Sequence, residues 1–150
     1  SIPRPEYRSA EDIRCATYLA LMYGAAGIVY HMGHDGVPLE DTRHWSVYPG
    51  LAREVEEVFA IVSTPQPEPG PKVTIQPESI DYRVRRVGDR IYIVAVNKAA
   101  YLVDATVTID DSALPLKHVS LPLENRKIVR GENGFSDVFT AYEPHVYELW

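Results

Sequence analysis

The sequence predicts an α/β segment of helix, strand and helix, followed by an all-β antiparallel sandwich. In residues 1–63, apolar residues recur at helical spacing on both sides of a short apolar run, whereas from Ile80 onward they alternate with polar residues. Between these parts, residues 64–79 are rich in proline, which excludes helix and interior strand. We therefore expect one domain over 1–63 and another over 80–150, joined by an extended connection over 64–79.

The first helix is predicted over residues 9–23. The side chain of Ser9 can accept a hydrogen bond from the free amides of the first turn, where Glu11 and Asp12 complement the positive end of the helix dipole. Gly24 supplies the left-handed conformation that commonly ends a helix.

A strand is predicted over residues 27–32. Gly27 precedes Ile28, Val29 and Tyr30, and the run has no polar alternation, as is typical of a strand buried on both faces of a parallel sheet. Such a strand needs a neighbour on each side, because its backbone polar groups would otherwise be buried without partners. We expect these neighbours to come from the remainder of a larger domain or from a second copy of the chain.

A second helix is predicted over residues 50–62. Pro49 stands where the first residue of a helix is expected, and the apolar positions that follow have helical spacing. Most charged residues lie on the opposite side of this helix, so it is suited to covering a sheet.

Short strands with turn signals fill the rest of the chain and indicate a small antiparallel sandwich or barrel. Asn133 and Gly134 form a tight-turn signal before one of these strands. The expected strands lie near residues 80–84, 91–96, 103–109, 118–121, 126–130, 135–139 and 145–149.

Composition excludes several classes of partner. The net charge is −6, with 21 acidic against 15 basic residues, which argues against nucleic acid or an anionic membrane as a partner. No apolar run approaches the ~20 residues needed to cross a membrane. Cys15 is the only cysteine, so neither a disulfide framework nor a thiolate zinc site is predicted.

The polar loop over residues 31–48 is long for a simple connection, and loops of this length after a buried strand are often functional. His31 and His34, together with Asp35, could in principle ligate a metal ion. No third ligand follows at a recognisable spacing, and two histidines at the end of a strand do not point to one side. No metal and no cofactor is therefore predicted.

Two groups of stretches carry a resemblance to a known family: residues 5–6, 9–14, 18–21 and 23–30, and residues 82–86, 91–97 and 143–149. The first group resembles the seventh helix and eighth strand of (β/α)8-barrel glycoside hydrolases of the β-galactosidase-like retaining kind. The second group resembles the terminal β-sandwich domain of the same enzymes. The resemblance implies that residues 1–63 are the last elements of a TIM barrel. It also implies that the acid/base and nucleophile carboxylates come from the fourth and seventh strands, before Ser1, so no catalytic residue is assigned here.

The same resemblance places a sugar-contact site on the loop. Active sites of these barrels open at the carboxyl ends of the strands, where Tyr30, His31 and His34 would emerge, with Trp45 further along the loop. Aromatic rings stack on sugar rings and imidazoles bond to hydroxyl groups, so these four residues are expected to bind substrate. The alternative, that they merely pack the loop, remains open.

Two other patterns also have two interpretations. Arg83 and Arg85 share a strand face with Asp81, which favours a solvated face over a phosphate site. The aromatic residues of the β domain favour core or domain interface over a carbohydrate platform; they are Tyr82, Tyr92, Tyr101, Phe135, Phe139, Tyr147 and Trp150.

The predicted function is that of a carboxyl-terminal fragment of a glycoside hydrolase that cleaves glycosidic bonds through carboxylates located elsewhere. The alternative is a non-catalytic carbohydrate-binding or structural β-sandwich module. The expected partners are carbohydrate and either the remainder of the barrel or a second copy of the chain. The sequence predicts no cellular compartment.

Overall fold

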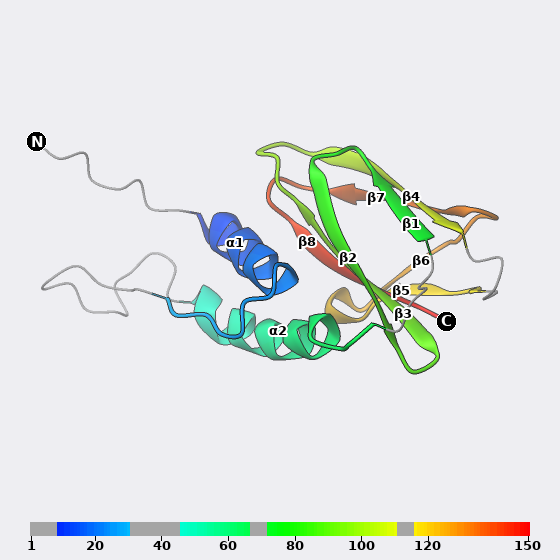
Figure 1. Ribbon diagram of the computed structural model, residues 1–150. Helices are drawn as coiled ribbons and strands as arrows, with labels where there is room; N and C mark the ends of the chain where they lie inside the picture. The colour runs from blue at the N-terminus through cyan, green and yellow to red at the C-terminus, as the bar shows by residue number, and fades with distance from the viewer. Residues whose placement is uncertain (1–8, 31–45, 67–71, 111–115) are drawn as a thin grey trace, which may run out of the picture.

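The computed structural model describes residues 9–30, 46–66, 72–110 and 116–150 (Figure 1). Two helices lie against one face of a two-sheet sandwich, so the described elements form three layers. The elements are α1 (Ala10–Met22), α2 (Val47–Val62), β1 (Lys72–Gln76), β2 (Ile80–Val87), β3 (Arg90–Asn97), β4 (Val103–Asp110), β5 (Val119–Leu121), the 3-10 helix η2 (Pro122–Glu124), β6 (Arg126–Ile128), β7 (Gly134–Phe139) and β8 (Pro144–Leu149).

Both sheets are antiparallel. The three-stranded sheet has the order β1-β4-β7, and the five-stranded sheet has the order β2-β3-β8-β5-β6. Strand β8 is the centre of the larger sheet, pairing with β3 on one side and with β5 on the other. The structure therefore confirms the predicted division into helices followed by an antiparallel sandwich.

The core of the sandwich lies between the two sheets. Strand β4 shows why these residues form it, because its burial alternates strictly from Val103 to Asp110. Its inward side chains pack beside those of β1 and β7 in the same sheet and meet those of β3 and β8 across the sandwich. Phe135 and Tyr147 pack against each other in this core, with ring centroids 4.9 Å apart.

A second core joins the helices to the outer face of the five-stranded sheet. Val94, Val96 and Val146 point away from the sandwich interior and are buried against α1 and α2. Tyr18 of α1 and Val58 of α2 are completely buried in this layer. This second core therefore joins the helices to the sandwich. In the part of the chain described, no helix is long and apolar enough to cross a membrane.

The boundaries of α1 follow the predicted signals. Ser9 and Asp12 form a reciprocal capping box, in which the Asp12 amide donates to Ser9 Oγ at 3.1 Å and the Ser9 amide donates to Asp12 Oδ2 at 3.2 Å. Gly24 has a φ of 91°, as a residue just past a helix end requires. Helix α2 begins at Val47, two residues before Pro49, and so includes Tyr48 in its first turn.

The predicted strand at 27–32 is not formed at residues 27–30, which have no strand partner. Val29 is 95% exposed, the opposite of a position buried on both faces. The physical reason is that an apolar strand needs neighbours on both sides, and among the described residues none lies beside it. His31 and Met32 lie outside the described residues.

Strand β1 corrects the predicted connection at 64–79. Its five residues alternate exposed and buried, and Val73 and Ile75 pack into the sandwich core. It pairs with β4 at the edge of the smaller sheet, and Pro77, just beyond its end, interrupts no ladder.

Arg83 and Arg85 do not form a solvated face. The Arg83 Nε donates to the carbonyl oxygen of Met22 at 3.1 Å, and the Arg85 Nε donates to that of Val62 at 3.0 Å. These carbonyls end α1 and α2, and neither helix has a basic residue in its own last turn. Strand β2 therefore supplies the cation that complements the negative end of each helix dipole.

Candidate functional site

An aromatic pair brackets the predicted functional loop. Tyr30 precedes residues 31–45 and Tyr48 follows them, and their rings meet edge to face with centroids 5.0 Å apart. Both side chains are half-buried. The two ends of the loop are therefore held together by a direct contact.

Helix α1 orients Tyr30 through a short hydrogen-bond chain. The Thr17 hydroxyl donates to the carbonyl oxygen of Ile13 at 2.8 Å, and Thr17 Oγ1 lies 2.7 Å from the Tyr30 hydroxyl. Because the Thr17 proton is already used, Tyr30 donates to Thr17, and the lone pairs of the Tyr30 oxygen are left to accept a bond from a ligand. Burial raises the pKa of Tyr30, so the phenol is neutral at neutral pH.

One carboxylate ties α1 to α2. Glu54 Oε2 accepts a bond from Arg14 Nε at 2.8 Å and from the Tyr18 hydroxyl at 2.7 Å. The Arg14 guanidinium lies 5.5 Å from the centre of the Tyr18 ring. Burial, and then the neighbouring Glu54, raise the pKa of Tyr18 well above its ordinary value, so Tyr18 acts as a neutral donor.

Of the four predicted sugar-contact residues, only Tyr30 lies in the described part of the chain. His31, His34 and Trp45 lie outside it, as do the loop acids Asp35, Glu40 and Asp41. The structure thus places one predicted residue and adds two that the sequence did not single out, Thr17 and Tyr48.

A second cluster of ionisable groups lies at one end of the sandwich. The Arg126 guanidinium donates two bonds to the Asp137 carboxylate, at 2.7 and 2.9 Å, and a third to Glu124 Oε2 at 3.0 Å. The buried His145 contacts Glu124 through Nδ1, and the Tyr147 hydroxyl donates to Asp137 Oδ2 at 2.9 Å. The sequence could have predicted part of this cluster, because side chains alternate along a strand and His145 and Tyr147 therefore point to the same inner face of β8.

The cluster holds two carboxylates in their charged form. Burial alone would raise the pKa of Asp137, but hydrogen bonds from Arg126, the Val138 amide and Tyr147 outweigh it and lower that pKa. Burial of Glu124 is likewise outweighed by bonds from His145 and Arg126, which lower its pKa. These groups join η2, β6, β7 and β8, so their evident role is to close this end of the sandwich.

The aromatic residues of the β domain, for which core or domain interface was favoured over a carbohydrate platform, do not form one surface. Phe135, Phe139 and Tyr147 are buried between the sheets, and the Tyr82 hydroxyl donates to the Val73 carbonyl at 2.9 Å. The exposed Tyr101 follows strand β3 at the end opposite to Arg90. The Tyr92 hydroxyl donates to Glu148, and the Trp150 ring lies against Arg90 and His118. Within the described ranges, no group of three or more His, Cys, Asp or Glu side chains is placed to hold a metal ion.

Comparison with known proteins finds no matching family model and no matching curated protein. Solved structures do match in fold. A Bacteroides fragilis protein assigned as an α-galactosidase matches 95% of this chain at 13% identity and a TM-score of 0.61, over 29% of its own length. The α-amylase of Geobacillus thermoleovorans, in complex with acarbose, matches 94% at 15% identity and a TM-score of 0.59, over 33% of its length. The γ-CGTase of Bacillus clarkii matches 95% at 17% identity and a TM-score of 0.51, over 24% of its length.

The chain has the fold of one part of these glycoside hydrolases. It spans about a third or less of their length, and the match includes the helices as well as the sandwich. At these identities the similarity shows the fold alone. The described residues of this chain contain no (β/α)8 barrel.

Proposed function

We propose that this chain is the non-catalytic part of a glycoside hydrolase, which packs against a (β/α)8 barrel that supplies the catalytic carboxylates. The sandwich and its two helices buttress that barrel. Residues 27–30 complete it as a strand, and Tyr30 with the loop that follows forms one side of a sugar subsite.

The observation that carries this proposal is the apolar segment 27–30. Val29 lies between Ile28 and Tyr30 in an apolar run of the kind that forms buried strands, and yet it is 95% exposed. Ile28 and Tyr30 are half-buried against the helices, whereas the Val29 side chain and the backbone groups of the run are unpaired. Pairing with further strands would bury Val29 and satisfy those backbone groups. The similarity of nearly the whole chain to less than half of several glycoside hydrolases supports a barrel as the source of those strands.

The decisive experiment compares Val29→Asp in two settings. In the 150-residue chain, position 29 is exposed, so the substitution should shift the melting temperature by less than about 2 °C. In the full-length protein encoded by the gene, it places an unpaired charge between strands and should cost about 3 kcal/mol or more, with loss of hydrolysis. α-Galactosides, α-glucans and β-galactosides are the substrates to assay.

Val129→Asp is the matched control, because Val129 is 93% exposed and lies beyond strand β6. It should be harmless in both settings. The proposal is overturned if Val29→Asp is equally harmless in the full-length protein, or if the gene encodes no barrel together with this chain.

A further inference from the structure

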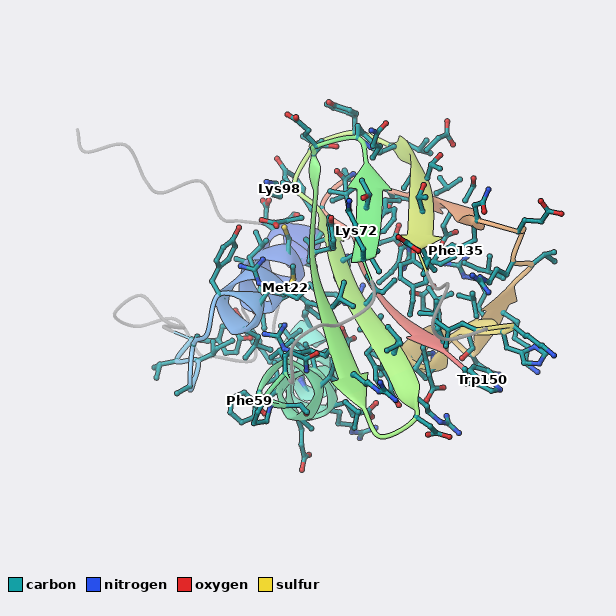
Figure 2. The ribbon with its side chains drawn as sticks, turned by 45° about the vertical axis from the view of Figure 1, so that its right-hand side comes forward. Met22, Phe59, Lys72, Lys98, Phe135 and Trp150 are labelled. Carbon is teal, nitrogen blue, oxygen red and sulfur yellow. The ribbon has the colours of Figure 1, made fainter. Side chains whose placement is uncertain are left out.

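The turn before β7 places an exposed asparagine directly ahead of a glycine, at Asn133 and Gly134. Figure 2 shows the next residue, Phe135, on the side of the sandwich away from Met22 and Phe59, which belong to the two helices. The turn is therefore remote from the helical layer and from the segment on which the proposed function rests. Its chemistry does not depend on that function.

The backbone amide of Gly134 points away from the neighbouring strand. Gly134 stands opposite Thr108 of β4. At the adjacent position, the Ile109 amide donates to the Asn133 carbonyl oxygen at 2.9 Å. Bonded and non-bonded pairs alternate along an antiparallel ladder, so Gly134 and Thr108 are a non-bonded pair whose amides point outward. The Gly134 carbonyl has the same direction, since it accepts from the Gly131 amide at 2.8 Å. Because β7 is the last strand of its sheet, the Gly134 amide faces the sheet edge.

We propose that Asn133 deamidates spontaneously in the folded protein, with water as the only co-reactant. The Gly134 nitrogen attacks the side-chain carbonyl carbon of Asn133, Cγ, and closes a five-membered ring. That nitrogen loses its proton, the side-chain Cγ–N bond breaks, and ammonia leaves, so a succinimide remains. Glycine favours this step because it has no Cβ to crowd the ring or to restrict the backbone.

Water then opens the succinimide at one of its two carbonyl groups. When the bond from the Gly134 nitrogen to Cγ breaks, the product is an ordinary aspartate. When the bond from that nitrogen to the backbone carbonyl carbon breaks, the product is isoaspartate, in which the main chain runs through Cγ. Either product adds a negative charge to the turn.

The other two asparagines of the chain, Asn97 and Asn125, lack this arrangement. Asn97 is completely buried, and its side-chain nitrogen donates to the carbonyl oxygens of Tyr101 and Thr140, both at 2.8 Å. These bonds hold its side chain away from the following amide. Asn125 is followed by Arg126, whose Cβ crowds the ring that would form. Asn133 should therefore react first.

The isoaspartate product disturbs the pairing of β4 with β7. It adds one carbon to the main chain between the Asn133 Cα and the Gly134 nitrogen. Gly134 has little room to move, since even a Cβ on it would lie 1.8 Å from the Val107 carbonyl oxygen. The extra carbon therefore displaces either the bond from Ile109 or the register with Thr108. The aspartate product keeps the original backbone and both of these contacts.

The test follows all three asparagines in one sample. Folded wild type is incubated in mildly alkaline buffer, digested, and mapped by mass spectrometry that separates aspartate from isoaspartate. Asn133 should convert at least about tenfold faster than Asn97 or Asn125, a barrier difference of about 1.4 kcal/mol. Asn133→Gln, in which closure needs a larger ring, should stay intact. A parallel incubation in urea measures the unfolded chain.

Melting curves test the consequence for the sandwich. Fresh Asn133→Asp has the charge of the product on an unaltered backbone, so it should melt as fresh wild type does. The isoaspartate form, purified from aged wild type, should melt at least about 2 °C lower. The proposal is overturned if Asn133 converts in urea but stays intact in the folded protein, if Asn97 or Asn125 converts as fast, or if the isoaspartate form melts as Asn133→Asp does.

Discussion

Asp137→Asn tests whether the ionised cluster closes the end of the sandwich. The carboxylate accepts two bonds from Arg126 and one from Tyr147, and its side chain is 8% exposed. Asparagine has nearly the same shape as aspartate, but one of the two carboxylate oxygens becomes an NH2 group. That group cannot accept a hydrogen bond from Arg126 or from Tyr147. Arg126 is 38% exposed, so solvent screening limits the contribution of its ion pair with Asp137 to about 1.5 kcal/mol. Loss of the hydrogen bond from the Tyr147 hydroxyl adds about 1.5 kcal/mol. The free energy of unfolding should fall by about 3 kcal/mol.

Urea unfolding followed by circular dichroism at pH 7 measures this change, which corresponds to about 6 to 12 °C in melting temperature for a chain of this size. Asp104→Asn is the matched control, since Asp104 is an exposed residue of strand β4, and it should cost less than about 0.5 kcal/mol.

The pH dependence has a defined sign. Because the pKa of Asp137 is lower in the folded protein than in the unfolded chain, its contribution is fully present above the unfolded value of about 3.9. The contribution is lost as pH falls through the lower folded value, so wild type and Asp137→Asn should converge in acid. A difference below about 1 kcal/mol at pH 7, or one that persists unchanged at pH 2, would refute the reasoning.

Two further substitutions test local features of the fold by the same urea assay. Arg85→Met removes the cation at the carboxyl end of α2 and should lower the free energy of unfolding by about 1.5 kcal/mol. The control Arg86→Met, at an exposed position of the same strand, should lower it by less than about 0.5 kcal/mol. Equal effects would contradict the capping role of Arg85. Gly134→Ala places a Cβ 1.8 Å from a carbonyl oxygen of β4 at a φ of 152° and should cost more than about 2 kcal/mol, while Gly131→Ala, whose Cβ meets its nearest atom at 3.5 Å, should stay within about 0.5 kcal/mol.

Features set by neighbouring residues could be predicted from the sequence. The capping box at Ser9, the end of α1 at Gly24 and the alternation along β4 each depend on a few consecutive residues. Strand β1 carried the same kind of signal in Val73 and Ile75, but the surrounding prolines favoured an extended connection. Proline excludes an interior strand, and it is compatible with one at a sheet edge.

Features set by distant residues could not be predicted in the same way. The alternation correctly placed Arg83 and Arg85 on one face, but that this face lies under two helix ends depends on how the helices dock. His145 was placed on the last strand, whereas its partner Glu124 comes from another element. For the candidate site, the approach of Tyr48 to Tyr30 depends on α2 beginning before Pro49.

The contact between Tyr30 and Tyr48 has a consequence for how such a protein diversifies. The rings of Tyr30 and Tyr48 lie 5.0 Å apart, centre to centre, so the residues that flank the segment 31–45 are joined by a contact made outside that segment. Doubling the length of a closed loop costs only about 0.6 kcal/mol in closure entropy. Insertions between these two residues should therefore cost little stability, and the two-core scaffold can stay the same while the length of this segment changes.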